Sequence, residues 1–175
     1  GGVTYSGIPT GGSASTLYSQ GFNGAPADWT TEIVTNLGTL ANPIITYVTS
    51  GTSANPVVTP SEGANCIEFN SYTCDAGDQI RLKKTTSIAT TGKTKITVVL
   101  DWYLDNTYTN SDNVTVQWST NGTNWNNSFV YYRYNATSGW VTVNSLLPAG
   151  AENQATLYIA LLFTGAYGDN CHLDN

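Results

Sequence analysis

The chain has 175 residues, 40% of them hydrophobic and only 10% charged, and its 6 basic and 12 acidic residues give a net charge of −6. This length is enough for one domain with a real core. The acidic balance argues against nucleic-acid binding, because no Lys/Arg cluster exists to neutralise phosphates. The one basic group, which consists of Arg81, Lys83 and Lys84, is more simply the solvated face of a strand. No apolar run approaches the roughly 20 residues of a membrane helix, so we expect no membrane span.

Residues 1–15 are rich in Gly and Ser, which is typical of a flexible leader, and they hold one short β-capable piece at 3–8. An alternative is an arm that pairs with the sheet edge of a neighbouring subunit. We therefore predict two parts: an N-terminal arm, flexible or strand-donating, at 1–15, and a single domain at 16–175.

The chain after the arm reads as a series of short strands separated by turn residues. Residues 16–31 predict a short strand, a turn over 24–28 and a return of the chain into the fold at Trp29. For residues 32–40 we favour an irregular to extended segment. Residues 57–59 lie between two prolines and suit an edge strand, because proline cannot donate to a ladder. Further strands are predicted at 44–49, 66–69, 79–83, 95–104, 139–146 and 155–164, the last apolar on both faces and therefore central.

Residues 113–134 predict a β-hairpin. Val114, Val116 and Trp118 alternate with polar residues, the dipeptide Asn121-Gly122 suits a tight turn, and a second alternating strand follows. We interpret this hairpin as the centre of the domain and as the most favourable recognition surface. The nine or ten regularly spaced strands predict an all-β fold, a two-sheet antiparallel jelly-roll sandwich.

Four segments in the right order resemble MAM-like and choice-of-anchor J jelly-roll domains. They are TLYSQGFNGAPADWTT at 16–31, VTVQWSTNGTNW at 114–125, SGWVTVNSLL at 138–147 and GDNCHLDN at 168–175. The resemblance implies a β-jelly-roll with no chemistry of its own. Such domains occur in secreted and surface proteins of bacteria and archaea, near adhesins, proteases and polysaccharide-acting enzymes.

The chain departs from this family at its early acidic positions, which in many jelly rolls help to hold a structural Ca²⁺. Gln20, Gly21 and Asn23 stand there, and their amide oxygens would hold the ion weakly. If the first and last strands pair, Asp169 and Asp174 come close to Gln20 and Asn23, and we predict a possible Ca²⁺ site at these four residues. Ordinary turn-capping is the alternative, and the loop 75–78 is a second, weaker candidate.

A second departure is that the chain stops at Asn175, before the usual final strand of the family. We expect this to leave a sheet edge open, and an open edge invites strand addition from another chain. Residues 1–15 are a candidate donor, whereas truncation of a longer chain is the simpler explanation.

Cys66, Cys74 and Cys171 permit at most one internal disulfide, with three possible pairings, and we favour Cys66 with Cys74. N-glycosylation sequons begin at four asparagines. They are Asn113, Asn121, Asn126 and Asn135. Together with the scarcity of charge, they favour an extracellular or cell-surface protein.

The residues offer little for catalysis. The one histidine, His172, stands next to a cysteine, and no nucleophile elbow or zinc-binding cysteine spacing occurs. Asp101 and Asp105 share a strand face but lie roughly 13 Å apart at about 3.3 Å per residue, too far for a glycosidase pair. We therefore expect no enzyme.

Aromatic side chains remain as the best candidates for ligand binding, because their flat faces stack on sugars. Trp102, Trp118 and Trp140 occupy inward positions, which leaves six others as candidates. They are Trp125, Tyr131, Tyr132, Tyr134, Tyr103 and Tyr108. We expect a non-catalytic extracellular module for adhesion or carbohydrate binding, with a glycan or surface protein as partner. The alternative is a filament or surface-layer subunit that polymerises with copies of itself through residues 1–15.

Overall fold

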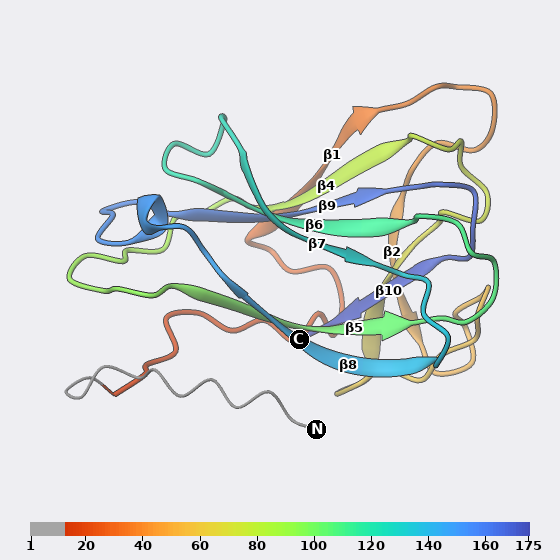
Figure 1. The fold of residues 1–175 in the computed structure, drawn as a ribbon, viewed down its shortest axis with the longest axis horizontal. Coiled ribbons are helices and arrows are strands. Elements are labelled where there is room, and N and C mark those ends of the chain that lie inside the picture. The colour runs from red at the N-terminus through yellow and green to blue at the C-terminus, as the bar shows by residue number, and fades with distance from the viewer. Residues whose placement is uncertain (1–12) are drawn as a thin grey trace.

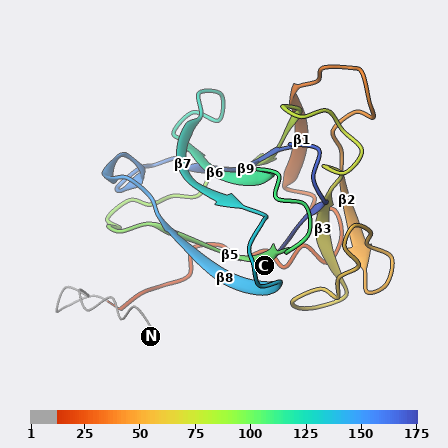
Figure 2. The same cartoon turned by 45° about the vertical axis from the view of Figure 1, so that its right-hand side comes forward.

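The computed structural model describes residues 13–175 and contains two antiparallel five-stranded sheets packed face to face (Figures 1 and 2). Sheet A has the order β1-β4-β9-β6-β7, with bounds Trp29–Thr35, Gln79–Lys84, Tyr158–Thr164, Asn113–Ser119 and Asn126–Tyr132. Sheet B has the order β2-β3-β10-β5-β8, with bounds Ile45–Thr49, Asn65–Phe69, Cys171–Asp174, Thr97–Leu104 and Gly139–Leu146. The predicted two-sheet antiparallel jelly-roll sandwich is therefore confirmed.

The core lies between the sheets and follows the alternation read from the sequence. Leu100 and Trp102 of β5 face Val114 and Val116 of β6 and are all at most 4% exposed. β9 is the middle strand of sheet A and is buried on both faces, as its continuous apolar run predicted. Among residues 13–175, the only helix is the short 3₁₀ turn η1 at Ala149–Ala151, and no helix is long and apolar enough to cross a membrane.

Two predicted strands are absent from the described part of the chain. Residues 13–28 contain no strand, and β1 begins only at Trp29. Residues 57–59 belong to the β2–β3 loop, which folds over the outer face of sheet B. There Val58 packs with Val48 and Cys66 against the rings of Tyr103 and Trp140. Val58 is thus buried by covering a sheet instead of by joining it.

The predicted hairpin is present as β6 and β7, but it is not the centre of the sandwich. β6 lies next to the central β9, whereas β7 forms the edge of sheet A. The connection spans six residues, with Asn121 Oδ1 accepting the backbone N–H groups of Thr123 and Asn124 and with Gly122 at a φ of 73°. Asn-Gly is therefore part of a longer capped turn.

The predicted Cys66–Cys74 disulfide is wrong, because all three cysteines are free. Cys66 points to the outer face of sheet B, whereas Cys74 belongs to the core between the sheets. The layer of sheet B separates the two thiols. Burial raises the pKa of both thiols to about 12, so they remain protonated at neutral pH.

A fully buried arginine joins the two sheets where the chain leaves β7. The backbone N–H of Arg133 donates to the Asp112 carbonyl at 2.8 Å, next to sheet A, and its carbonyl accepts the N–H of Asp105 at 3.0 Å, next to sheet B. Its guanidinium pairs with the carboxylates of both aspartates and donates to the carbonyls of Thr107 and Tyr108. One side chain therefore fixes the crossover between the layers.

The aspartates extend this network into neighbouring loops. Asp112 Oδ1 accepts the N–H of Ala166 at 2.7 Å, and Asp169 accepts the hydroxyl of Thr107. Burial raises the pKa of Asp169, and the adjacent Asp105 carboxylate raises it further. Three acidic groups thus gather around one buried cation.

We predict that Arg133→Met destabilises the protein by about 3–5 kcal/mol, because it leaves buried carboxylates without their cation. Urea denaturation measures this loss. Lys83→Met is the control: Lys83 forms a partly exposed ion pair with Glu32, and its loss is expected to cost less than about 1 kcal/mol. Equal costs for the two variants would contradict the account.

Candidate functional site

The outer face of sheet A has a floor that solvent barely reaches. Thr115 and Gln117 of β6 and Ala160 and Leu162 of β9 point away from the core, yet each is at most 7% exposed. Longer side chains from β1, β4, β7 and the β6–β7 loop surround this floor. We call these residues the sheet A face.

A row of hydrogen bonds crosses the sheet A face from β1 to β6. The Arg81 Nε–H on β4 donates to Gln117 Oε1 at 2.8 Å, across β9. Arg81 Nη1 pairs with Glu32 Oε2 on β1 at 2.8 Å. The small side chain of Ala160, opposite Gln117 on β9, leaves room for this reach. The guanidinium is thus held from both sides.

The row continues to the edge of the sheet and gains a second cation. Gln117 Nε2 donates to Asn127 Oδ1 on β7 at 2.7 Å, and Lys83 Nζ contacts Glu32 Oε2 at 2.9 Å. The hydrogen bond from Lys83 and then that from Arg81 lower the pKa of Glu32, so Glu32 is ionised at neutral pH. Four strands thereby contribute to one ordered polar surface.

Trp125 supplies the aromatic component of this surface. Its ring lies 5.4 Å from the Arg81 guanidinium carbon, a cation–π arrangement. Arg81 carries five N–H donors, and its hydrogen bonds to other groups within residues 13–175 use only those on Nε and Nη1. Donors therefore remain beside a half-buried indole, the combination that orients a polar ligand on an apolar platform.

Only two of the six predicted ligand-binding aromatics lie on the sheet A face. Trp125 lies beside Arg81, and Tyr132 of β7 is 55% exposed, opposite Asn113 and toward the other end of the strands. Tyr131 points between the sheets, with its hydroxyl 2.7 Å from Ser145 Oγ. The structure therefore does not bring the six predicted aromatic residues together at one site.

The other three tyrosines lie elsewhere. Tyr103 is covered by the β2–β3 loop and contacts the rings of Trp140 and His172. Tyr108 is 59% exposed and lies in the β5–β6 loop, with its ring beside that of Tyr72. Tyr134 follows β7, and its backbone forms an isolated β-bridge with Asp105. None of these three belongs to the sheet A face.

The four residues of the predicted Ca²⁺ site do not gather at one place. Asn23 Oδ1 accepts the N–H of Ala64, and Asp174 Oδ2 accepts the N–H of Glu62, so both hold one turn. Gln20 Oε1 accepts the N–H of Phe22, whereas Asp169 belongs to the Arg133 network. Residues 13–175 contain no group of three His, Cys, Asp or Glu side chains suited to a metal. Bound Ca²⁺ stays a prediction.

In the loop 75–78, the second candidate Ca²⁺ site, both carboxylates already accept hydrogen bonds from another segment of the chain. Asp75 accepts the backbone N–H groups of Thr39 and Leu40, and Asp78 Oδ1 accepts that of Leu37. Both carboxylates thus anchor the chain that follows β1.

The four sequon asparagines all have hydrogen-bond partners. Asn121 and Asn135 accept backbone N–H groups of their own turns, and Asn113 and Asn126 donate to the carbonyls of Ser111 and Trp118. Glycosylation of these residues stays a prediction.

Sequence reasoning missed Arg81, because Arg81, Lys83 and Lys84 read as the solvated face of a strand. That interpretation is wrong for Lys84, which is 5% exposed and pairs with Asp28 at 2.8 Å. Alternation does place Arg81 and Gln117 on outward positions. What brings Arg81 and Gln117 together is the strand order β4-β9-β6. These three strands are far apart in the sequence, so no local pattern predicts the order.

Comparison with known proteins identifies the fold of this chain. No family model and no curated protein matches the chain, so the resemblance to MAM-like and choice-of-anchor J domains rests on its motifs. The structure is similar to that of TmCBM61 in complex with β-1,4-galactotriose, with 13% identity, a TM-score of 0.55 and coverage of 91% of this chain and 95% of that one. It is also similar to a structure of carbohydrate-binding modules of the β-sandwich superfamily (12%, TM-score 0.53, coverage 88% and 58%). At these identities the likeness establishes the β-sandwich jelly-roll.

We predict that Arg81→Lys costs about 1–3 kcal/mol, because a lysine has no Nε–H fork and leaves the Gln117 oxygen without its donor. In a Gln117→Met background that oxygen is already gone, and the same change is expected to cost less. Urea denaturation of the two single variants and the double variant measures the coupling. Strict additivity would show that the two side chains do not depend on each other.

Proposed function

We propose that the protein is a non-catalytic carbohydrate-binding module whose sheet A face contacts a glycan. The observation that carries the proposal is the Arg81 guanidinium held between Glu32 and Gln117, with the Trp125 ring beside it. A sugar ring has an apolar face that stacks on an indole and hydroxyls at its rim that accept from a guanidinium.

The hydrogen bonds among the side chains of the site support this assignment, because they hold the site in a fixed arrangement before any ligand binds. Arg81, Gln117 and Asn127 are already ordered by one another, so binding requires little loss of side-chain freedom. Tyr132 lies farther along the same face and offers a second stacking surface for a longer chain. The site therefore suits an extended oligosaccharide.

The fold comparison supports the same class of function, since the similar structures are of modules that bind carbohydrate. The motif resemblance and the sequons favour a secreted or cell-surface setting, where such a module would serve adhesion or keep a neighbouring domain near a polysaccharide. A surface glycoprotein is then as suitable a partner as a free glycan. No comparison favours a filament subunit, and residues 1–12 of the proposed arm lie outside the described residues.

We predict that Trp125→Ala weakens glycan binding at least about tenfold, or ~1.4 kcal/mol, while the fold is retained. The measurement is affinity electrophoresis against β-1,4-galactan, xylan and mannan, followed by calorimetry with the polysaccharide that binds. Tyr108→Ala is the matched control, because it removes an exposed aromatic ring outside the sheet A face. Loss of binding in Tyr108→Ala with full binding in Trp125→Ala would refute the assignment.

A further inference from the structure

The sheet A face carries a charge of the opposite sign to that of the whole chain. Among the described residues, Glu32 is the only acidic residue in the five strands of this sheet, whereas Arg81 and Lys83 both lie on its outer face. The β6–β7 loop beside them, at 120–125, contains no charged residue. Two cations and one anion leave a charge of +1 on this face, in a chain whose net charge is −6.

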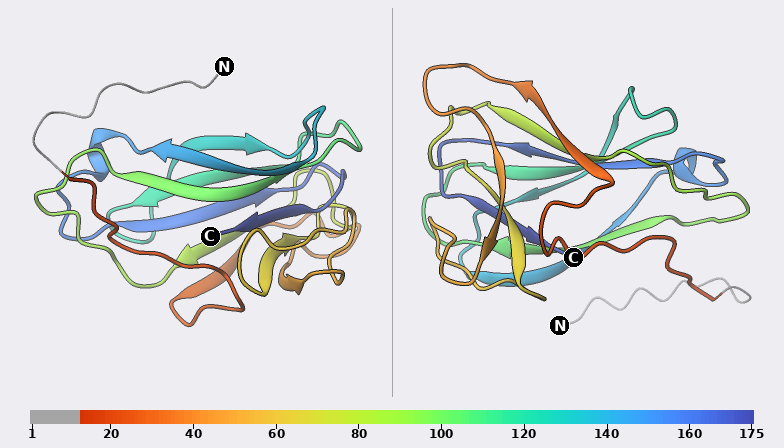
Figure 3. Two further views of the ribbon diagram at one scale, coloured as in Figure 1. Left: turned by 90° about the horizontal axis from the view of Figure 1, so that it is seen from below. Right: turned by 180° about the vertical axis from the view of Figure 1, so that it is seen from behind.

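The opposite side of the sandwich is acidic. In the left view of Figure 3, the strands β5, β8 and β10 of sheet B lie in front of those of sheet A. Trp102 and Leu173 are buried in the core, so the alternation along each strand places Asp101, Asp174 and likewise Glu68 on the outer face. The strands of sheet B contain no lysine or arginine within residues 13–175. The electrostatic field therefore favours an anionic ligand at sheet A over sheet B.

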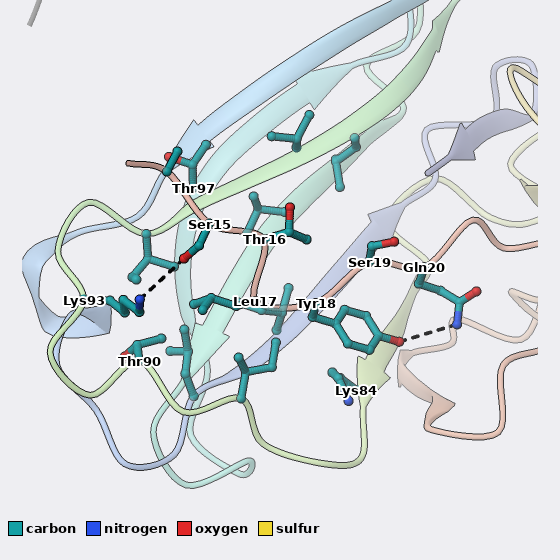
Figure 4. A pocket seen from close by; sticks show the side chains of 18 of the residues that line it. Ser15, Thr16, Leu17, Tyr18, Ser19, Gln20, Lys84, Thr90, Lys93 and Thr97 are labelled. Atoms are coloured by element: carbon teal, nitrogen blue, oxygen red, sulfur yellow. Dashed lines mark hydrogen bonds between the residues drawn. The ribbon is translucent and has the colours of Figure 1, made fainter. Parts of the chain in front are cut away.

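The four other basic residues of the chain lie away from the sheet A face. Arg133 and Lys84 are buried and paired with aspartates. Lys93 and Lys95 belong to the loop between β4 and β5, and Lys93 Nζ lies 3.4 Å from Ser15 Oγ beside a pocket between the two sheets, as Figure 4 shows. The cations that a ligand on the sheet A face would meet are therefore Arg81 and Lys83.

These two cations lie in one row across the sheet, next to the aromatic ring. Lys83 of β4 and Gln117 of β6 are both in register with Ala160, on the two sides of β9. The Arg81 Nε–H reaches across β9 to Gln117 Oε1 at 2.8 Å. The guanidinium therefore crosses Ala160 in the same row as Lys83. The Trp125 ring lies at this row too, with its centre 5.4 Å from the guanidinium carbon.

Glu32 holds the two cations together without neutralising both. Arg81 Nη1 and Lys83 Nζ contact the same oxygen, Glu32 Oε2, at 2.8 and 2.9 Å. The Nη2 group of Arg81 has no hydrogen-bond partner in the described part of the chain. The side chains of Arg81 and Lys83 are only 13% and 28% exposed, and a partly desolvated cation binds an anion more strongly than a fully hydrated one. One positive charge and the Nη2 donors thus remain for a ligand.

We propose that the sheet A face selects glycans that contain uronic-acid units; this inference rests on the function proposed above and adds the class of sugar. A uronic acid combines a pyranose ring, which stacks on Trp125, with a carboxylate at the rim of that ring. The planar guanidinium of Arg81 matches a carboxylate, and Lys83 adds a point charge beside it. A neutral sugar offers only hydroxyl oxygens, which accept weaker hydrogen bonds.

Calorimetry with matched pairs of polysaccharides tests the proposal on the whole chain. The probes are polygalacturonate and glucuronoxylan, and each is compared with the same polymer after its carboxyl groups have been reduced to alcohols. In a pair that binds, we expect the acidic form to bind at least about tenfold more tightly at low salt. We expect the difference to shrink at about 1 M salt, where the Debye length is about 3 Å.

Lys83→Gln tests whether the preference comes from this face. We expect it to remove most of the difference in affinity between the acidic and the reduced form, because it takes one of the two cations from beside Glu32. Lys93→Gln is the matched control: it changes the net charge by the same amount, at an exposed position outside the sheet A face. In this variant we expect the preference to stay as in the wild type.

Three results would overturn the proposal, and they separate it from the proposed function. Equal affinities for the acidic and the reduced forms, both lost in Trp125→Ala, would refute the selection of uronic acids and leave glycan binding at this face in place. A preference that falls equally in Lys83→Gln and Lys93→Gln would show that the net charge, and not the sheet A face, sets it. Failure of every polysaccharide to bind, in both forms, would refute the proposed function and this inference with it.

Discussion

The buried guanidinium of Arg133 is the interaction on which the arrangement of the two sheets depends. Arg133 lies where the chain passes from β7 toward sheet B. Its backbone N–H and carbonyl form hydrogen bonds with Asp112, next to sheet A, and with Asp105, next to sheet B. The Asp112 carboxylate also accepts hydrogen bonds from the backbone N–H groups of Ala166 and Gly168 in the β9–β10 loop. An arginine suits this position because its planar group has five donors and can satisfy two carboxylates and two carbonyls at once. Removing it would leave several charges uncompensated in the interior.

With one end of the sandwich fixed in this way, sheet A presents an ordered outer face. The residues of that face depend on one another: Ala160 is small enough for Arg81 to pass over β9, and Gln117 then orients the guanidinium beside Trp125. The face is polar in its hydrogen-bonding groups and apolar in its floor. This mixture is the reason for proposing the sheet A face, and not another side of the sandwich, as the recognition surface.

Alternation along the chain predicted most strands and most inward residues, because each follows from a period of two within one segment. Trp102, Val114 and Leu161 are buried as expected. The errors concern which segments become neighbours. β7 is an edge strand, Val58 covers a sheet from outside, and Cys66 and Cys74 lie on opposite faces of sheet B. Each depends on contacts between distant segments.

The candidate site divides in the same way. The flat aromatic side chains of Trp125 and Tyr132 were recognisable from the sequence, and both lie on the sheet A face. Arg81 and Gln117 were not recognisable, because a charged residue on a strand usually belongs to a solvated face. Their link requires β4 and β6 to flank β9, an order that no local pattern contains. Arg133 was missed for a related reason: its carboxylate partners lie in other connections of the chain.

The central claim is that glycan binds the sheet A face at Trp125. The five tryptophans give five indole N–H signals in a ¹⁵N correlation spectrum, which single Trp→Phe variants assign. During titration with oligosaccharides of β-1,4-galactan, xylan and mannan, the account predicts that the Trp125 signal shifts most. The signals of Trp102, in the core, and Trp140, under the β2–β3 loop, are expected to stay in place. A titration in which Trp140 shifts and Trp125 does not, or in which no saccharide moves Trp125, would contradict it.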